Sequence, residues 1–324
     1  MIITLLQIVF GLLILALSAD RLVDHASDIA SHYGMSALMV GLTVVAFGTS
    51  APEMIVSIMA VLADSGELAV GNALGSNIAN LGLILGIAAL VASTQSPLKL
   101  QTSLAKKELP LLIVMTLAAG YALYDLQLTR LEGALLLSGQ AAFFWVLLKS
   151  QKATASPSNE EEYRSSNQST RPIYRRWLGL GISLGLLLAS SNVLVSGATA
   201  LSLRLGVPEA VVGVSVIAIG TSLPELAATL ASIKKQQQDL AVGNIIGSNI
   251  MNITLVLSMA GLLKPTIIEA TVFLRDYSLA LTLTLSLAGF YLLSPKQGLI
   301  RHWQGAAWVT SYGAYISYLV YTHL

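Results

Sequence analysis

The chain has 324 residues, of which 55% are hydrophobic and only 11% charged, and its mean hydropathy is +0.73. Soluble domains carry about 25% charged residues, so this composition excludes a soluble globular protein. A formal net charge of +1 provides no basic field for nucleic acid, and the absence of cysteine excludes disulfides, thiolate catalysis and cysteine-bound zinc. The expected surroundings of this chain are a lipid bilayer.

Apolar runs long enough to cross a hydrocarbon core of about 30 Å recur along the chain. The first begins at residue 2 without a basic segment before it and without a clear cleavage site, so we interpret it as a retained span and not as a signal peptide. The sequence predicts ten spans, at residues 2–24, 36–63, 68–92, 104–124, 131–149, 176–203, 208–233, 239–263, 273–293 and 302–321.

The only sizeable polar stretch lies between the fifth and sixth spans. It is rich in Ser, Asn and Glu, which is typical of a solvated flexible linker. A regulatory cation site at its three consecutive glutamates, residues 160–162, is the alternative, but adjacent side chains make a poor cage. The predicted organisation is a first five-helix repeat at 1–150, a cytoplasmic linker at 151–173, and a second repeat at 174–324.

Internal repetition decides the predicted architecture. Residues 41–90 align with residues 213–262 at a constant offset of 172 without gaps, with 22 identities in 50 positions. The best-matched blocks are GTSAPE at 48–53 with GTSLPE at 220–225, and the GN and GSN motifs at 71–77 with those at 243–249. Matches at Gly, Pro, Ser and Asn in register do not arise from shared apolar composition, so we infer a duplicated unit.

Five spans per unit bring the second copy into the membrane from the opposite side, which predicts inverted repeats, a common design of transporters. With the amino terminus outside, 14 of the 18 Lys and Arg residues lie in inside loops. Because positive residues accumulate on the cytoplasmic side, both termini are expected outside. The predicted fold is an all-α membrane protein with ten transmembrane helices in two inverted five-helix repeats.

A glutamate lies in the middle of one predicted span of each unit, at Glu53 and Glu225. A charge at the bilayer centre costs about 2.5–3.5 kcal/mol on insertion scales, so a matched pair indicates function. Pro52 lacks the amide hydrogen that the Gly48 carbonyl would accept, so the helix is expected to break and leave carbonyls near residues 46–48 unpaired. Such a break is tolerated at this depth only if it is buried in protein or lines a cavity. We therefore predict broken helices at the membrane midplane.

The residues around each glutamate offer hard oxygen ligands, which Ca²⁺ and Na⁺ prefer. Spacing of i, i+4 and i+8 places the ligands of each unit on one stripe of a helix. We predict ion binding by the two glutamates, with a structural hydrogen-bonded carboxyl as the alternative. The two stripes are Thr49, Glu53 and Ser57 in the first unit, and Thr221, Glu225 and Thr229 in the second.

The following span of each unit adds further polar side chains at mirrored positions. Ser76 and Asn80 share a face at i, i+4, and Ser248 and Asn252 repeat them. Such groups either coordinate an ion or form hydrogen bonds between helices. For Ser76, Asn77 and their counterparts alone, hydrogen bonding between helices is the preferred interpretation.

Two copies of G-T-S-x-P-E, each followed by G-N-x-x-G-S-N, resemble the alpha repeats of the Ca²⁺:cation antiporter superfamily, the sodium/calcium exchanger-like membrane proteins. The resemblance implies that Glu53 and Glu225 are the paired carboxylates of a cation site. It implies alternating access by sliding of the first and sixth spans against a fixed core. The further ligands that it implies are the side chains of Thr49, Thr221, Ser50, Ser222, Ser76 and Ser248 and the carbonyls of Ala46 and Ala218, with Asn80 and Asn252 as candidates beside them.

The resemblance further implies a secondary active transporter of the bacterial inner membrane, without a cofactor. Its cargo is expected to be Ca²⁺ in exchange for a monovalent cation, Na⁺ first, with H⁺ or K⁺ as alternatives. Many relatives carry an acid at one of the positions of Asn80 and Asn252, whereas both are amides here. The maximum charge of the predicted site is −2, which one Ca²⁺, two Na⁺ or two H⁺ would neutralise and three Na⁺ would not. The identity of the counter-ion is left open.

Three other classes of protein compete with an exchanger. In an intramembrane hydrolase, Ser50 or Ser222 would be the nucleophile, but the four histidines lie outside the duplicated core, and only the glutamates offer a base within the two blocks. A passive cation channel shares the need for a polar lining, and a required counter-ion on the opposite side would distinguish an exchanger from it. A structural membrane protein has no need of paired intramembrane acids.

Overall fold

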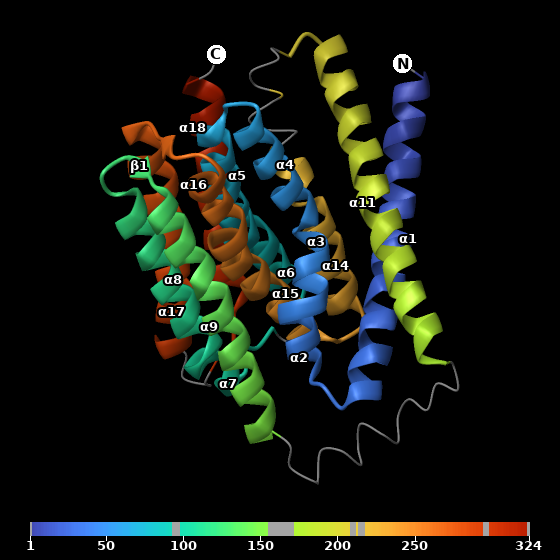
Figure 1. Cartoon of the computed structure of the whole chain (residues 1–324). Helices are drawn as coiled ribbons and strands as arrows, with labels where there is room; N and C mark the ends of the chain where they lie inside the picture. Colours follow the sequence, from blue (N-terminus) through green and yellow to red (C-terminus); the bar gives the residue numbers. More distant parts are fainter. Residues whose placement is uncertain are drawn as a thin grey trace.

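The computed structural model describes residues 2–92, 98–154, 172–207, 212, 218–293 and 298–322 and is almost entirely helical. The chain ends N and C lie at one end of the molecule, and the helices that flank the linker, α9 and α11, end and begin at the opposite end (Figure 1). Most of the predicted linker, including residues 160–162, lies outside the described residues, as does the start of the span predicted at 208–233.

The first half of the chain contains one long helix, a broken span, a span with a wide π-helical turn, and two further helices. Most of its helices match predicted spans, but the first helix continues to Tyr33 and is longer than the predicted span 2–24. Its elements are α1 (Ile2–Tyr33), α2 (Ala37–Val40), η1 (Gly41–Val45), α3 (Ala46–Thr49), α4 (Ala51–Leu62), α5 (Gly66–Ile78), η2 (Ala79–Ile84), α6 (Leu85–Val91), α7 (Thr102–Lys106), α8 (Glu108–Leu123), β1 (Gln127–Leu128) and α9 (Arg130–Thr154), where η denotes a π-helical segment.

The described helices of the second half follow the same order as in the first, although the short strand precedes the fourth span in the second half and follows it in the first. Its broken helix and its π-helical turn fall at the same places relative to the polar motifs as in the first half. Its elements are α11 (Ile173–Arg204), α13 (Ala218–Thr221), α14 (Leu223–Lys234), α15 (Gln238–Met251), η4 (Asn252–Leu257), α16 (Ser258–Leu263), β2 (Thr266–Ile267), η5 (Val272–Tyr277), α17 (Ser278–Leu293) and α18 (His302–Thr322).

Backbone conformation recurs at the offset of 172 found in the sequence. Each long helix is followed by a glycine in the left-handed region, Gly34 after α1 and Gly206 after α11, with φ of 64° and 83°. This conformation ends a helix readily only at a residue without a β-carbon, which explains why α1 runs on until Gly34. The other described residues with positive φ also pair at this offset: Asp64 with Gln236, and Leu126 with Gly298.

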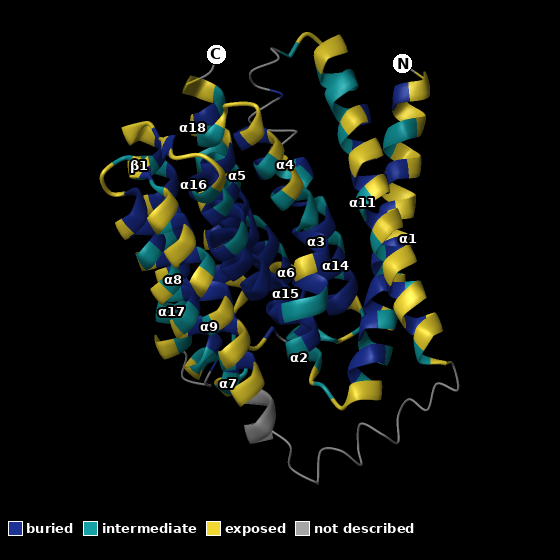
Figure 2. Ribbon diagram, in the orientation of Figure 1, coloured by how far each residue is buried: buried dark blue, intermediate teal, exposed yellow. Residues whose placement is uncertain are grey.

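The buried core is centred on the segments that carry the GSN motifs. In the most apolar part of each segment, 83% of the residues between the start of α15 and the end of α16 are buried, and 72% of those between the start of α5 and the end of α6. The corresponding share for α1 is 28%. Figure 2 shows the same contrast, with buried residues on α15 and exposed residues along the outer sides of α1 and α11. The central segments are therefore shielded by the other helices, while the outer apolar faces are suited to lipid.

The long helices α1 and α11 lie side by side and pack mainly on each other (Figure 1). A separate apolar cluster joins them to the edge of the core, through residues such as Leu22 of α1, Leu187 of α11 and Ala228 of α14. A larger cluster holds the remaining helices together around α5, α8 and α15. The molecule thus consists of a two-helix pair beside a larger helical body.

Both ends of the molecule are tied by pairing between the two halves. At the end with the chain termini, β1 and β2 form a short antiparallel pair, and Lys264 forms an ion pair with Asp64. At the opposite end, Leu100 donates its amide to the Gly298 carbonyl at 2.8 Å, and Lys235 lies 2.5 Å from Asp24 of α1. Each end therefore combines loops that were predicted to share one side of the membrane.

Six helical segments of the described part are long and apolar enough to cross a membrane, or seven when the bent pair α2–α4 is counted as one span. Three of the ten predicted spans are not among the segments that are long and apolar enough. Helix α8 has only 16 residues, α18 is less apolar, and residues 213–217 before α13 lie outside the description. The coarser prediction of a multi-span helical membrane protein is confirmed.

Candidate functional site

The predicted helix break is present in both halves and falls at a serine. Helix α3 ends at Thr49, Ser50 has φ −83° and ψ 3°, and α4 begins at Ala51 at an angle of 42° to the preceding segment. Ser222 adopts nearly the same conformation, φ −89° and ψ 4°, between α13 and α14. In each half a proline occupies the first turn of the new helix, where its missing amide hydrogen costs no hydrogen bond.

One detail of that prediction was wrong. The Ala46 carbonyl was expected to be unpaired, but it accepts the Ser50 amide at 3.0 Å. This bond closes the last turn of α3, so the helix bends only after that turn is complete. In the second half, Ser222 donates its amide to the Ile219 carbonyl at 3.1 Å, and the side chain of Ala218 lies outside the description.

The two glutamates occupy equivalent positions at the beginnings of half-helices. Glu53 lies in the first turn of α4 and Glu225 in the first turn of α14, and each is only 1% exposed. The positive end of a helix dipole favours a carboxylate in the first turn, which offsets part of the cost of burial. The two carboxylates also interact electrostatically with each other. Their mutual repulsion in a buried site favours a bound cation.

Side chains of the first repeat reach directly into the second. Ser50 Oγ lies 3.0 Å from Glu225 Oε1 and 2.9 Å from Ser248 Oγ. Thr49 Oγ1 donates to Asn244 Oδ1 at 3.2 Å. The structure therefore brings together four of the predicted ligands, Thr49, Ser50, Glu225 and Ser248, at the boundary between the two broken helices.

Two asparagines next to the glutamates were not among the predicted site residues. Asn72 of α5 donates through Nδ2 to the Glu53 carbonyl at 3.1 Å and to Ser57 Oγ at 3.0 Å. Its counterpart Asn244 is fully buried and accepts from Thr49 instead. The signal that could have identified them was their place in the matched motif G-N at 71–72 and 243–244.

Four amides form a clasp between α5–η2 and α15–η4. Asn80 Nδ2 donates to Asn249 Oδ1 at 3.3 Å, and Asn252 Nδ2 donates to Asn77 Oδ1 at 3.1 Å. These two bonds are equivalent under the offset of 172. Asn77 Nδ2 adds a bond to the Asn249 carbonyl at 3.2 Å. The sequence left hydrogen bonding and ion coordination open for these residues, and the structure shows hydrogen bonding through the amide nitrogens.

Several buried oxygens around the glutamates have no hydrogen-bond partner within the part of the chain that the structure describes. Because an unpaired buried oxygen costs roughly 1–3 kcal/mol, a concentration of them indicates a site for a ligand that oxygens coordinate, such as a cation. Two amide nitrogens of α15, Asn244 Nδ2 and Asn249 Nδ2, are also without a partner in the described structure. The oxygens are Glu53 Oε2, Glu225 Oε2, Asn80 Oδ1, Asn252 Oδ1, Ser222 Oγ and Thr229 Oγ1.

The composition of the site selects the kind of cation. No group of three or more His, Cys, Asp or Glu side chains placed to hold one metal ion occurs among the described residues, so the two glutamates are joined by neutral oxygens alone. Nitrogen and sulfur ligands typical of zinc or copper sites are therefore missing from this described group. Of the predicted ligands, Ser76 is buried and Thr221 is only half-buried. Carboxylate, hydroxyl and amide oxygens fit Ca²⁺ and alkali ions.

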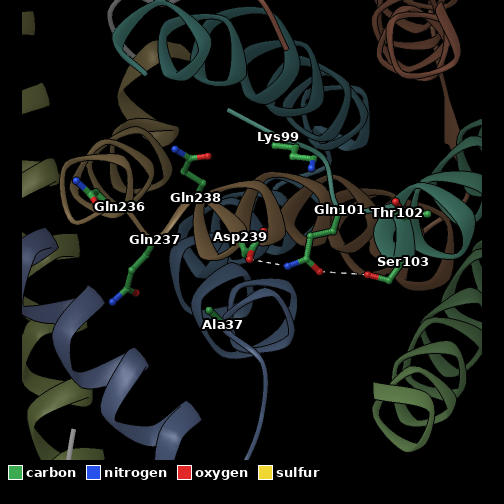
Figure 3. Close-up of a pocket in the computed structure, with 9 residues that line it drawn as sticks. All are labelled: Ala37, Lys99, Gln101, Thr102, Ser103, Gln236, Gln237, Gln238 and Asp239. Carbon is green, nitrogen blue, oxygen red and sulfur yellow. Dashed lines mark hydrogen bonds between the residues drawn. The ribbon is translucent and has the colours of Figure 1, made fainter. Parts of the chain in front are cut away.

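A separate polar cavity of about 650 Å³ opens at the end of the molecule away from the chain termini (Figure 3). Asp239 accepts from Gln101 Nε2 at 2.5 Å, and Gln101 accepts from Ser103 at 3.2 Å. Asp239 precedes Ser248 by nine residues on α15, which is about 13 Å along a helix axis. This cavity is distinct from the glutamate site. Its lining consists of Ala37, Lys99, Gln101, Thr102, Ser103, Gln236, Gln237, Gln238 and Asp239.

Comparisons with known proteins agree with this arrangement. The profile of the sodium/calcium exchanger protein family matches residues 3–149 and 176–321. Inner membrane protein YrbG of Escherichia coli is 40% identical over 87% of this chain and 86% of that protein. The sodium/calcium exchanger MaX1 of Methanosarcina acetivorans is 28% identical, with 98% of each chain covered.

Solved structures give the same result. A structure of the sodium-calcium exchanger NCX_Mj matches with a TM-score of 0.81 at 29% sequence identity, and 98% of both chains is covered. The likeness therefore extends over the whole fold and is not restricted to the polar motifs. The chain belongs to the sodium/calcium exchanger family within the Ca²⁺:cation antiporter superfamily, whose members are membrane transporters and not enzymes.

Proposed function

We propose that the protein is a secondary active transporter that exchanges Ca²⁺ for a monovalent cation, Na⁺ in the first place, across the inner membrane. The observation that carries this proposal is the pair of buried glutamates at mirrored helix breaks, each with one carboxylate oxygen that has no hydrogen-bond partner in the described structure. The relatives named sodium/calcium exchangers and the relative named an inner membrane protein support the cargo and the membrane.

The proposed site combines charge with neutral ligands. Glu53 and Glu225 provide two negative charges at the beginnings of the half-helices, and hydroxyls and amides from both halves complete the coordination. Ca²⁺ takes six to eight oxygen ligands in flexible geometry, so a site of side-chain oxygens from several helices is suitable. In this proposal the predicted ligands are Thr49, Thr221, Ser50, Ser222, Ser76, Ser248, Asn80, Asn252 and the carbonyls of Ala46 and Ala218.

The proposed topology has ten transmembrane helices in two inverted repeats, at 1–150 and 174–324, joined by a cytoplasmic linker at 151–173. The recurrence of helix breaks and positive-φ residues at an offset of 172 supports two equivalent units. The placement of both termini at one end supports an odd number of spans before the linker and after it (Figure 1). Both termini are proposed to face the periplasm, because most of the Lys and Arg residues then face the cytoplasm.

Alternating access requires a part that moves against the site. The α1–α11 pair is suited to this role, because it packs mainly on itself and meets the core through a separate apolar cluster. The glutamates, by contrast, belong to short half-helices that are tied to the core. Asn72 of α5 donates to the Glu53 carbonyl, and Ser50 contacts both Glu225 of α14 and Ser248 of α15. We therefore propose that the pair slides while the site stays fixed.

The experiment that tests this function is uptake of ⁴⁵Ca²⁺ into proteoliposomes under separate Na⁺, K⁺ and pH gradients. An exchanger accumulates Ca²⁺ only when a counter-ion is present on the opposite side, and reversal of that gradient reverses the flux. Uptake that proceeds down the Ca²⁺ gradient without any counter-ion would identify a channel. No flux under any gradient, from protein that is folded and inserted, would refute the proposal.

A further inference from the structure

We infer that exchange by this protein is electroneutral, with one divalent cation exchanged for two monovalent cations. This inference rests on the proposed function and adds its coupling ratio. It follows from the charge of the buried site, from the neutral amides at two site positions, and from the cost of leaving an unbalanced charge in the core of the protein.

The central site of the described structure contains two carboxyl groups and no basic side chain. Its buried polar residues are Ser, Thr and Asn apart from Glu53 and Glu225. Two other acids of the described structure are buried. Asp276 bonds to Arg275 and to Tyr315 of α18, so its charge is balanced elsewhere. Glu108 lies in the first turn of α8 and does not form a metal-binding group with the two glutamates. Within the described residues no third acidic or histidine side chain joins the two glutamates.

The acidic residues outside the described part do not belong to the duplicated polar motifs of the sequence. Residues 160–162 belong to the predicted linker between the fifth and sixth spans. Glu209 is the second residue of the predicted span 208–233 and precedes Glu225 by 16 residues in the sequence. The described residues contribute a charge of −2 to the site when both glutamates are ionised.

Asn80 and Asn252 carry amides that are neutral at any pH, and the bonds that they donate fix the orientation of these amides. Each amide nitrogen is used across the boundary between the halves, to Asn249 Oδ1 and Asn77 Oδ1 respectively. Each amide oxygen is left without a partner in the described structure. The clasp therefore supplies two neutral oxygens and no charge to the site.

Charge balance then sets the ratio of ions. One Ca²⁺ or two monovalent cations bring a site of −2 to neutrality, whereas three monovalent cations leave a net positive charge. An unbalanced charge in a buried site costs several kcal/mol even after the protein relaxes. When one divalent ion is exchanged for two monovalent ions, the occluded site is neutral with either cargo bound. No net charge then moves across the membrane in a full cycle.

The test is the response of exchange to membrane potential. Purified protein in liposomes is allowed to reach the equilibrium Ca²⁺ ratio against a fixed gradient of the active monovalent ion. The potential is set with valinomycin and K⁺, or with a protonophore and a pH gradient if K⁺ is the counter-ion. Electroneutral exchange predicts the same Ca²⁺ ratio at every potential, equal to the square of the monovalent ratio. Exchange against three monovalent ions predicts a cubic dependence and a shift of about 50-fold per 100 mV.

A charge variant makes the prediction sharper. Asn252→Asp adds a third acid at the site, and we expect its exchange to become dependent on potential. Gln140→Glu is the matched control, because Gln140 is a buried residue of α9 that contacts Thr254, on the opposite face of η4 from Asn252. That control is expected to leave the equilibrium ratio of wild type unchanged.

The possible outcomes separate this inference from the function on which it rests. A Ca²⁺ ratio independent of potential in the wild type supports electroneutral exchange, whether or not the variants fold. A ratio that shifts with potential overturns the inference and leaves the exchanger intact. The absence of any counter-ion-dependent Ca²⁺ flux overturns the proposed function, and the inference with it.

Discussion

Ser50 and Ser222 occupy equivalent helix breaks but have different surroundings, and this difference predicts unequal effects of the same substitution. Ser50 Oγ contacts Glu225 Oε1 at 3.0 Å and Ser248 Oγ at 2.9 Å. Ser222 Oγ is buried and has no hydrogen-bond partner in the described structure. Ser50→Ala therefore removes a hydrogen bond to a charged group, whereas Ser222→Ala removes a hydroxyl that makes none.

The expected magnitudes follow from these contacts. A hydrogen bond to a charged group contributes about 1.5–3 kcal/mol to stability, so Ser50→Ala should lower the free energy of unfolding of the ion-free protein by that amount. Removal of an unpaired buried hydroxyl is neutral or slightly stabilising, and Ser222→Ala should change stability by less than about 0.5 kcal/mol. In the presence of Ca²⁺ both variants should lose affinity, because both hydroxyls are proposed ligands.

The assay is thermal unfolding of the purified protein in detergent, first with chelator and then over a series of Ca²⁺ concentrations. Ser50→Ala should melt several degrees below wild type in chelator, and Ser222→Ala should melt with wild type. The Ca²⁺-dependent rise in melting temperature should be smaller in both variants. Equal destabilisation of the ion-free protein by the two substitutions would refute the hydrogen-bond asymmetry on which this reasoning rests.

Three further predictions concern other parts of the account. Thr49→Val and Thr221→Val should each lose only part of the ⁴⁵Ca²⁺ exchange activity, because a hydroxyl is one ligand among several, and wild-type flux in both would exclude them as ligands. Gly243→Ala should destabilise the protein by about 1–3 kcal/mol in detergent unfolding, since a β-carbon there would lie 2.5 Å from the Leu38 carbonyl. The control Gly181→Ala has open space, and should be tolerated. Reporter fusions in the linker and at the carboxyl terminus should report cytoplasm and periplasm respectively, and the same location for both would contradict the proposed topology.

The sequence predicted the helix breaks because their cause is local. A proline without an amide hydrogen interrupts the same turn in each repeat, whatever surrounds it, and the breaks lie within two residues of Pro52 and Pro224. The end of α1 was less well predicted, although its cause is also local. The apolar run stops near Val23, but the helix continues through a polar stretch until Gly34 adopts a positive φ.

Contacts between the two repeats could not be predicted in the same way. An offset of 172 shows which residues are equivalent but not which residues face each other. Ser50 meets Ser248 and Glu225, and Asn80 meets Asn249, only because of how α3–α4, α14 and α15 pack. The different partners of Asn72 and Asn244 also depend on this packing, since identical motifs in the sequence give no reason for an asymmetry.

The central claim is that Glu53 and Glu225 together bind the transported cation. Its most direct test is calorimetric Ca²⁺ binding by Glu53→Gln and Glu225→Gln, with ⁴⁵Ca²⁺ exchange measured on the same monodisperse samples and exposed Glu269→Gln as the control. Glutamine keeps the shape and one oxygen but removes the charge, so a dehydrated divalent ion would face a single carboxylate. The account predicts that each site variant stays folded and loses Ca²⁺ binding and exchange to a similar extent, while the control matches wild type. Wild-type binding and exchange by either site variant would contradict it.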